Sequence, residues 1–198
     1  MSQEDSTSRK AFFSESLNLV KRGLSVQLDK KLHKILEGPV RPPGALDELE
    51  FLSSCTRCSA CVEACPYQAL RKQPQSAGLA AGAPYLDLDR QACQLCSDFP
   101  CVNACETGAL GSGVVQMGRA VVNEETCLTY QDQVCSLCYD ACPYPERAIN
   151  LGFDFHPQVT SECIGCGACT QICPTHPSSI PVLSPTQWRK KELEDRLF

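Results

Sequence analysis

Hydrophobic residues recur every three or four positions through the first part of the chain, which places them on one face of a helix. The pattern predicts an amphipathic helix over residues 11–36, with Gly23 as a weak point. The proline-rich and glycine-rich stretch 38–44 ends it. We expect the apolar face to pack on the rest of the chain, and docking to a partner or a membrane surface is the alternative. The face comprises Phe13, Leu17, Val20, Leu24, Leu28, Leu32 and Ile35.

Residues 51–186 carry an internal repeat of about 35–40 residues. Each repeat has an apolar segment, a cysteine-rich loop, a short helix and a second apolar segment, a sequence typical of small βαβ units. Leading strands are expected from Tyr85, Ala120 and Phe155. Returning strands are expected at Gln68, Thr107, Arg147 and Ser179.

The remaining segments complete the expected organisation of the chain. The linker 72–84, rich in Ala, Gly, Pro and Gln, predicts an exposed loop. Residues 188–198 predict a short helical tail that is solvated, with Trp188 packed down. We therefore expect three parts: a helical extension and linker (1–50), a body of four cysteine repeats (51–186) and a helical tail (187–198).

Cysteine dominates the chemistry that the composition allows. The chain has 16 cysteines among 198 residues, against three histidines, and they form four groups of four with none left over. The first and fourth motifs read C-x2-C-x2-C-x3-C-P. The second widens the middle gap to four residues and has Glu106 in place of the proline, and the third widens the first gap to seven. The motifs are Cys55, Cys58, Cys61 and Cys65; Cys93, Cys96, Cys101 and Cys105; Cys127, Cys135, Cys138 and Cys142; and Cys163, Cys166, Cys169 and Cys173.

This spacing favours iron–sulfur clusters. Two-residue steps let one loop wrap three sulfurs around a face of a cubane, and the fourth sulfur must come from elsewhere. In two-cluster ferredoxins the cysteine before the proline binds the other cluster, so motifs work in pairs. Four motifs predict an α+β fold of two ferredoxin-like modules, in which all sixteen cysteines hold four 4Fe-4S clusters. The spacing leaves open whether the motifs pair one with two and three with four, or one with four and two with three.

Two other cysteine chemistries are weaker interpretations. Structural zinc sites draw on separated C-x2-C pairs. Disulfides would require an exported chain, and no uninterrupted apolar run resembles an export signal. No stretch reaches the length of a transmembrane segment.

Residues between and beside the ligands have expected supporting roles. Gly165 and Gly167 permit backbone turns closed to residues with a Cβ and bring N–H groups near the sulfurs. Glu106 indicates either an exposed or altered cluster or a tolerated substitution. Four tyrosines are expected to shield clusters from water: Tyr67, Tyr130, Tyr139 and Tyr144.

The acidic net charge argues against nucleic acid as a partner and favours a protein with a basic surface. The formal net charge of −5 does not fit a nucleic-acid-binding protein. Residues 51–186 contain six Lys or Arg and twelve Asp or Glu, so we expect a partner with a basic docking patch. The histidines at 33, 156 and 176 join no recognisable catalytic constellation, so an enzyme is not expected.

With the motifs placed, the chain resembles a known group. The stretches CTRCSACVEACP (55–66), CQLCSDFPCVNAC (93–105), and MGRAVV (117–122) followed by CLTYQDQVCSLC (127–138) are similar to the ferredoxin-type proteins of periplasmic nitrate reduction and methylamine utilisation, the NapF, NapG and MauM group. The unusual third spacing is the most diagnostic feature. The resemblance covers roughly residues 50–183 and implies an electron-transfer role for the sixteen cysteines.

The resemblance also bears on the compartment. NapG and MauM types look like twin-arginine exported proteins, whereas here Arg9 and Lys10 precede no apolar segment. We therefore expect a cytoplasmic protein, as for NapF types, with a periplasmic or membrane-associated location as the alternative.

The functional hypothesis is a polyferredoxin that passes single electrons between a redox donor and an oxidoreductase. One alternative is an accessory or maturation factor for a molybdenum-containing reductase. Another is a permanent electron-transfer subunit of a larger respiratory complex. The expected partner is a redox protein, such as a molybdoenzyme or a quinol-oxidising membrane subunit.

Overall fold

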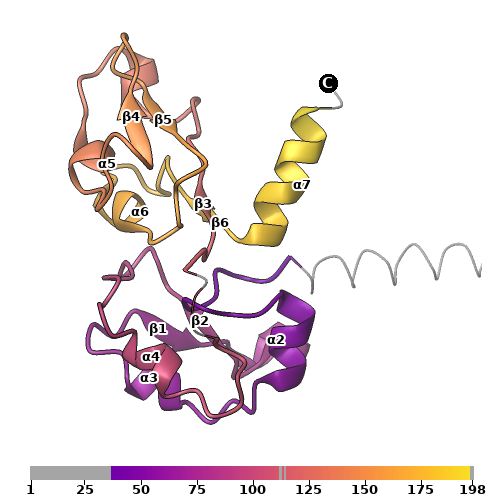
Figure 1. The fold of residues 1–198 in the computed structure, drawn as a ribbon. Helices are drawn as coiled ribbons and strands as arrows, with labels where there is room; N and C mark the ends of the chain where they lie inside the picture. Colours follow the sequence, from indigo (N-terminus) through magenta and orange to yellow (C-terminus); the bar gives the residue numbers. More distant parts are fainter. Residues whose placement is uncertain (1–36, 112, 114, 197–198) are drawn as a thin grey trace, which may run out of the picture. The chain divides into compact units, whose positions relative to one another are not determined.

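The computed structural model describes residues 37–111, 113 and 115–196 (Figure 1). The helix expected over residues 11–36 lies outside this range. Within it, two stretches share one plan, and we call them the N-terminal half (residues 37–111) and the C-terminal half (residues 118–196).

The N-terminal half is built around an antiparallel hairpin. Strand β1 (Leu70–Lys72) pairs with β2 (Pro84–Leu86), and a 3-10 helix, η1 (Gln75–Ala80), lies in their connection. Helix α2 (Glu48–Ser54) precedes the hairpin, and α3 (Ala60–Glu63) packs against α4 (Pro100–Asn103). An antiparallel bridge between Ala45 and Leu110 joins the two ends of this half.

The C-terminal half repeats the plan. Strands β4 (Ile149–Leu151) and β5 (Pro157–Val159) form the antiparallel hairpin, and α5 (Leu137–Asp140) packs against α6 (Ala168–Ile172). Strand β3 (Arg119–Ala120) pairs antiparallel with β6 (Val182–Leu183), in the place of the Ala45–Leu110 bridge. A 3-10 helix, η2 (Leu128–Gln131), lies inside the long first gap of the third motif.

The strands form close to the predicted positions, but the βαβ expectation was wrong. All three strand pairs among the described residues are antiparallel. A parallel crossover needs a connection of a dozen or more residues that returns along the strand, and the helices α3 to α6 have only four or five residues. Strand β1 therefore pairs with β2, and β4 pairs with β5, each as an antiparallel hairpin.

The linker after β1 is more ordered than an exposed loop. It contains η1, and the Arg57 guanidinium donates hydrogen bonds to the carbonyls of Ala81 (3.0 Å) and Leu79 (2.8 Å). The Leu79 side chain is nevertheless 68% exposed. The expectation of an exposed loop holds for the tip and not for the whole linker.

A buried ion pair, which the sequence analysis did not anticipate, fixes α2 to the hairpin. The Arg41 guanidinium donates two hydrogen bonds to the Glu48 carboxylate, at 2.9 and 2.6 Å, and a third to the Pro84 carbonyl at 2.7 Å. It also lies 4.8 Å from the centre of the Phe51 ring, which is fully buried. These contacts tie the segment before α2, the helix and β2 together.

Helix α7 (Pro185–Asp195) begins three residues earlier than predicted. Ser184 caps its N-terminus and forms a capping box with Gln187, with Pro185 at the first helical position. Trp188 packs down as expected, with the Arg119 guanidinium 4.4 Å from its ring centre. Glu192 pairs with Arg119 and Lys190 with Glu37, so the helix contacts the body and is not only a solvated tail.

Candidate functional site

The sixteen cysteines surround four pockets, and each pocket is lined by four of them. In every pocket, three cysteines come from one motif and the fourth is the last cysteine of another motif. Site 1 has Cys55, Cys58, Cys61 and Cys105; site 2 has Cys93, Cys96, Cys101 and Cys65; site 3 has Cys163, Cys166, Cys169 and Cys142; and site 4 has Cys127, Cys135, Cys138 and Cys173.

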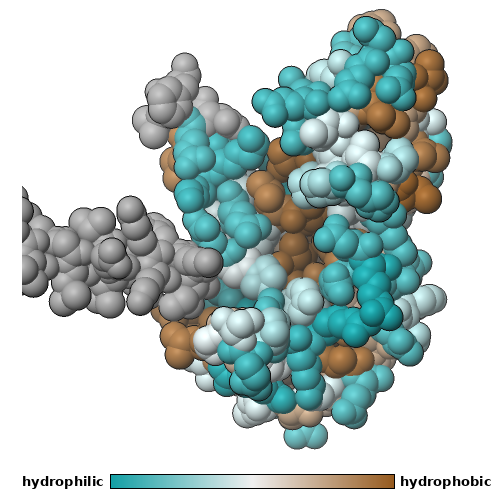
Figure 2. All heavy atoms as spheres, turned by 180° about the vertical axis from the view of Figure 1, so that it is seen from behind, coloured by the Kyte–Doolittle hydropathy of each residue, from teal (hydrophilic) through white to brown (hydrophobic). Residues whose placement is uncertain are grey.

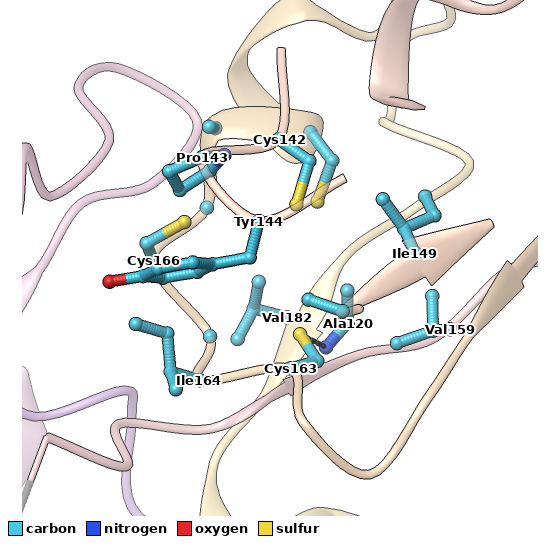
Figure 3. A pocket seen from close by; sticks show the side chains of 15 residues that line it. Ala120, Cys142, Pro143, Tyr144, Ile149, Val159, Cys163, Ile164, Cys166 and Val182 are labelled. Atoms are coloured by element: carbon cyan, nitrogen blue, oxygen red, sulfur yellow. Dashed lines mark hydrogen bonds between the residues drawn. The ribbon is translucent and has the colours of Figure 1, made fainter. Parts of the chain in front are cut away.

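This arrangement decides between the pairings that the spacing leaves open. The first motif exchanges its last cysteine with the second, and the third exchanges with the fourth. In the structure the motifs pair consecutively and are not nested. Figure 3 shows site 3, where Cys142 approaches the loop of Cys163 and Cys166 from a separate segment.

The width of the sites fits a cluster better than a single ion. A tetrahedral zinc at about 2.3 Å from each sulfur holds the sulfurs within about 3.8 Å of one another. Among the described residues, no three Cys, His, Asp or Glu side chains lie close enough for one metal ion. All sixteen cysteines are free thiols, so no disulfide occupies any site. Four thiolates around a wider pocket are the donor set of a 4Fe-4S cubane.

The third cysteine of each motif lies on a short helix, Cys61 on α3, Cys101 on α4, Cys138 on α5 and Cys169 on α6. In the fourth motif the backbone before this helix is left-handed at Gly165 (φ 76°) and Gly167 (φ 83°), which confirms the expected turns.

Two other motifs make the same turns without glycine. Arg57 (φ 61°) and Ser59 (φ 76°) are left-handed in the first motif, and Leu95 (φ 50°) and Phe99 (φ 42°) in the second. Left-handed backbone is strained for residues with a Cβ. The three hydrogen bonds of the Arg57 guanidinium to carbonyls, two of them on the linker after β1, hold the first of these turns.

Gly167 also allows a close contact between the two halves. A Cβ at this position would lie 2.6 Å from the Leu88 side chain, which belongs to the N-terminal half. The glycine is therefore required by packing as well as by its backbone angle.

Threonines that the sequence did not single out lie against cysteine sulfurs of sites 1 and 4. The Thr107 hydroxyl is 3.6 Å from Cys105 Sγ in site 1, and the Thr175 hydroxyl is 3.2 Å from Cys173 Sγ in site 4. A ligating thiolate carries no proton, so the hydroxyl must be the donor. Thr129 lies in the same way 3.4 Å from Cys127 Sγ. The shared sequence signal is a threonine two residues after a pocket-lining cysteine.

Tyrosine takes the equivalent position in sites 2 and 3. Tyr67 and Tyr144 each follow a Cys-Pro pair and line the pocket of that cysteine. The Tyr144 ring lies beside Cys142 and Cys166 (Figure 3). These two tyrosines fit the predicted shielding role. Tyr130 and Tyr139 line none of the four pockets. The Tyr130 ring stacks on His156, and the Tyr139 hydroxyl donates a hydrogen bond to the Glu146 carboxylate.

Backbone amides also reach the sulfurs. The Leu110 amide donates to Cys105 Sγ at 3.4 Å, and the Ala120 amide donates to Cys163 Sγ at 3.5 Å. Such hydrogen bonds stabilise negative charge on the sulfur and thereby tune a metal centre.

Burial governs the proton affinity of most of the thiols. It raises the pKa of Cys61, Cys93, Cys101 and Cys138 to about 11, and that of Cys169 to about 12. Burial acts in the same direction on Cys105 and Cys173, but hydrogen bonds outweigh it and lower the pKa of both thiols. Without metal, the buried thiols hold their protons at neutral pH, so iron binding must displace them.

Contacts between the sites place them in the order 1, 2, 3, 4. Helix α3 of site 1 packs against α4 of site 2, and α5 of site 4 packs against α6 of site 3. The halves meet where the Cys93 amide of site 2 donates a 2.9 Å hydrogen bond to the Cys166 carbonyl of site 3. The Ala92 amide adds a 3.0 Å bond to the Gln171 side chain on α6.

Site 1 is the largest of the four. Its cavity is about 210 Å³, against about 20 Å³ for each of the others. Cys58 is exposed to solvent, and Glu106 lines the same cavity. Of the two interpretations of Glu106, this geometry favours a solvent-exposed site.

Family comparisons agree with this geometry. Residues 54–109 match the family described as 4Fe-4S dicluster domain, and this range holds the first and second motifs. Residues 157–177 match the 4Fe-4S binding domain and hold the fourth motif. The third motif lies outside both ranges, and its assignment to site 4 rests on the structure.

Similar proteins extend the match over most of the chain. Ferredoxin-type protein NapG of Escherichia coli is 37% identical over 188 residues, which cover 86% of this chain and 81% of the relative. The chain belongs to the NapG and MauM group of ferredoxin-type proteins. Methylamine utilization ferredoxin-type protein MauM of Methylorubrum extorquens is 39% identical over 73% of this chain and 72% of its own length. Ferredoxin-type protein NapF of Escherichia coli is 33% identical over 68% of this chain and 80% of its own length.

The resemblance inferred from the motifs is thereby confirmed. No solved structure matches the chain. Within the part of the chain that the structure describes, no helix is long and apolar enough to cross a membrane. The expectation of a cytoplasmic location gains no support from these relatives.

Proposed function

We propose that this chain is an electron carrier that holds four 4Fe-4S clusters, one in each of sites 1 to 4. The observation that carries the proposal is the lining of every pocket by three cysteines of one motif and one of its partner. A bound 4Fe-4S cluster supplies a one-electron couple whose potential depends on its surroundings.

The protein's own residues then set the character of each site. Thr107 and Thr175 donate hydrogen bonds to ligand sulfurs at sites 1 and 4, which favours the more negative, reduced state there. Tyr67 and Tyr144 cover sites 2 and 3 with aromatic rings and exclude water, which disfavours added negative charge.

The order of the sites supports exchange with two partners at opposite ends. Sites 1 and 4 end the series, and sites 2 and 3 lie inside it. We place the electron donor and the electron acceptor at these two ends. Both are redox proteins, and the motif resemblance favours a molybdoenzyme or a quinol-oxidising membrane subunit as one of them.

Two other functions would use the same clusters but differ in the protein that the chain binds and in how long it stays bound. A maturation factor would bind a reductase precursor, and a permanent subunit would co-purify with its complex in fixed stoichiometry. Anaerobic affinity purification from the host, followed by identification of the bound proteins, separates both from a freely exchanging carrier.

Anaerobic reconstitution tests the proposal itself. We expect about 16 iron and about 16 inorganic sulfide per chain, four of each for every cubane. Reduction should then take up about four electrons, with cubane signals in electron paramagnetic resonance. Fewer than about 12 iron per chain under saturating conditions would contradict four clusters.

A further inference from the structure

An unusual group of exposed hydrophobic side chains lies beside site 4. Val134 and Phe153 are fully exposed, Phe155 is 65% exposed and Leu137 is 41% exposed. Hydrophobic residues appear at the surface of the C-terminal half in Figure 2, among hydrophilic ones. We call Val134, Leu137, Phe153 and Phe155 the apolar patch.

Residues of the apolar patch line site 4 or lie next to residues that line it. Leu137 lines the pocket of site 4, and Val134 precedes its ligand Cys135. Phe153 and Phe155 lie in the connection between β4 and β5, four and two residues before Pro157, which also lines that pocket.

Stacking of two rings holds the two segments of the patch together. The Tyr130 and His156 rings stack with their centres 3.9 Å apart, and a His156 ring nitrogen lies 3.2 Å from the Thr129 carbonyl. The long gap of the third motif and the β4–β5 connection therefore share one surface.

Carboxylates are frequent in the two segments that carry this patch, and we call them its acidic rim. Residues 121–160 contain one basic residue, Arg147, which is paired with Glu162. The same stretch has six acidic residues, Glu124, Glu125, Asp132, Asp140, Glu146 and Asp154. Asp154 is held beside His156 at 3.2 Å, and Asp140 accepts a 2.7 Å hydrogen bond from Ser136 on the segment that enters α5.

We propose that the apolar patch and its acidic rim form the docking surface for a redox protein whose own contact face is apolar inside a basic rim. This inference rests on the proposed function, because it makes site 4 the point of exchange with that protein. Opposite charges steer such partners together, and an apolar centre excludes water from a small, short-lived interface.

The charges disfavour the other occupants. An acidic rim repels a membrane surface that carries anionic lipid. It also repels the same rim on a second copy of this chain. A redox protein with a basic rim around an apolar contact face would attract the acidic rim and pack against the apolar patch.

The test uses the full, cluster-loaded chain and cytochrome c as a cationic haem protein probe, with an acidic plant-type ferredoxin as the negative probe. Carbodiimide joins carboxylates in contact with lysines, and peptide mapping locates the joined residues. We expect cross-links to cytochrome c at Asp132, Asp140 or Asp154, lost at high salt, and none to the acidic probe.

A matched pair of double variants isolates the apolar centre. Phe153→Ser with Phe155→Ser should weaken binding to cytochrome c about tenfold or more. Leu49→Ser with Leu79→Ser removes side chains that are 67% and 68% exposed in the N-terminal half, and should leave binding unchanged.

Several results would overturn the inference. They are no binding of cytochrome c, equal weakening by both double variants, and cross-links confined to the N-terminal half. Self-association or anionic-vesicle binding that the phenylalanine pair abolishes would assign the patch to another occupant. Iron content and cubane signals are measured on the unaltered chain and on every variant. If the unaltered chain holds its clusters but does not dock, this inference fails and the proposed function still stands.

Discussion

The backbone amide of Cys93 donates a 2.9 Å hydrogen bond to the carbonyl of Cys166. These residues belong to sites 2 and 3, so one peptide hydrogen bond connects the two halves at their innermost sites. Leu88 and Gly167 pack together at the same junction. The junction between sites 2 and 3 therefore includes a close contact, that of Gly167 with Leu88, where an added side chain would intrude.

Gly167→Ala tests this junction. The new Cβ would meet Leu88 at 2.6 Å and occupy left-handed backbone, so we expect destabilisation by about 2–4 kcal/mol in urea unfolding. Gly108→Ala is the matched control, because Gly108 has a φ of 73° and open space around it. The control should cost only about 1 kcal/mol. Equal losses would show that the contact with Leu88 carries no stability.

The threonines at the outer sites should raise the reduction potentials there. Thr175→Val removes the hydroxyl that lies 3.2 Å from Cys173 Sγ. A hydrogen bond worth about 1 kcal/mol corresponds to roughly 40 mV for a one-electron couple, so the potential of site 4 should fall by about that amount. Redox titration followed by electron paramagnetic resonance measures it.

Thr175→Ser retains the hydroxyl and is the control for that experiment. It should keep the potential close to that of the unaltered chain. A shift of the same size in both variants would attribute the effect to packing and not to the hydrogen bond.

Removing one partner of the buried Arg41–Glu48 ion pair should lower the free energy of unfolding. Arg41→Met leaves the Glu48 carboxylate buried without its partner, and we expect a loss of about 3–5 kcal/mol. Combining it with Glu48→Leu removes both charges, so the double variant should recover much of that stability in urea unfolding. A double variant less stable than Arg41→Met would contradict this account.

Cysteine spacing carried the sequence prediction furthest. The three cysteines that each motif contributes to one pocket, the turns at Gly165 and Gly167, and the positions of the short strands follow from local pattern, because each is decided within about ten residues. The pairing of motifs could not be predicted this way. It depends on which last cysteine crosses to which loop, and that is settled by the packing of α3 on α4 and of α5 on α6.

The features that the sequence did not predict depend on contacts between residues far apart in the chain or on the direction of strands, and neither leaves a local pattern. The partnership of Arg41 with Glu48 and Pro84 spans up to 43 positions and has no periodic signal. The βαβ expectation was wrong because apolar runs do not reveal strand direction. Arg57 and Phe99 adopt left-handed backbone that propensity assigns to glycine, since the contacts around the loops hold them there.

The exchange of last cysteines between paired motifs is the central claim, and counting iron in two double variants tests it most directly. Cys55→Ser with Cys105→Ser alters two motifs but only site 1, whereas Cys55→Ser with Cys65→Ser alters one motif but sites 1 and 2. After anaerobic reconstitution, we predict a loss of about four iron for the first variant and about eight for the second. A loss of about eight for the first and about four for the second would show that each motif holds its own cluster, and would contradict the account.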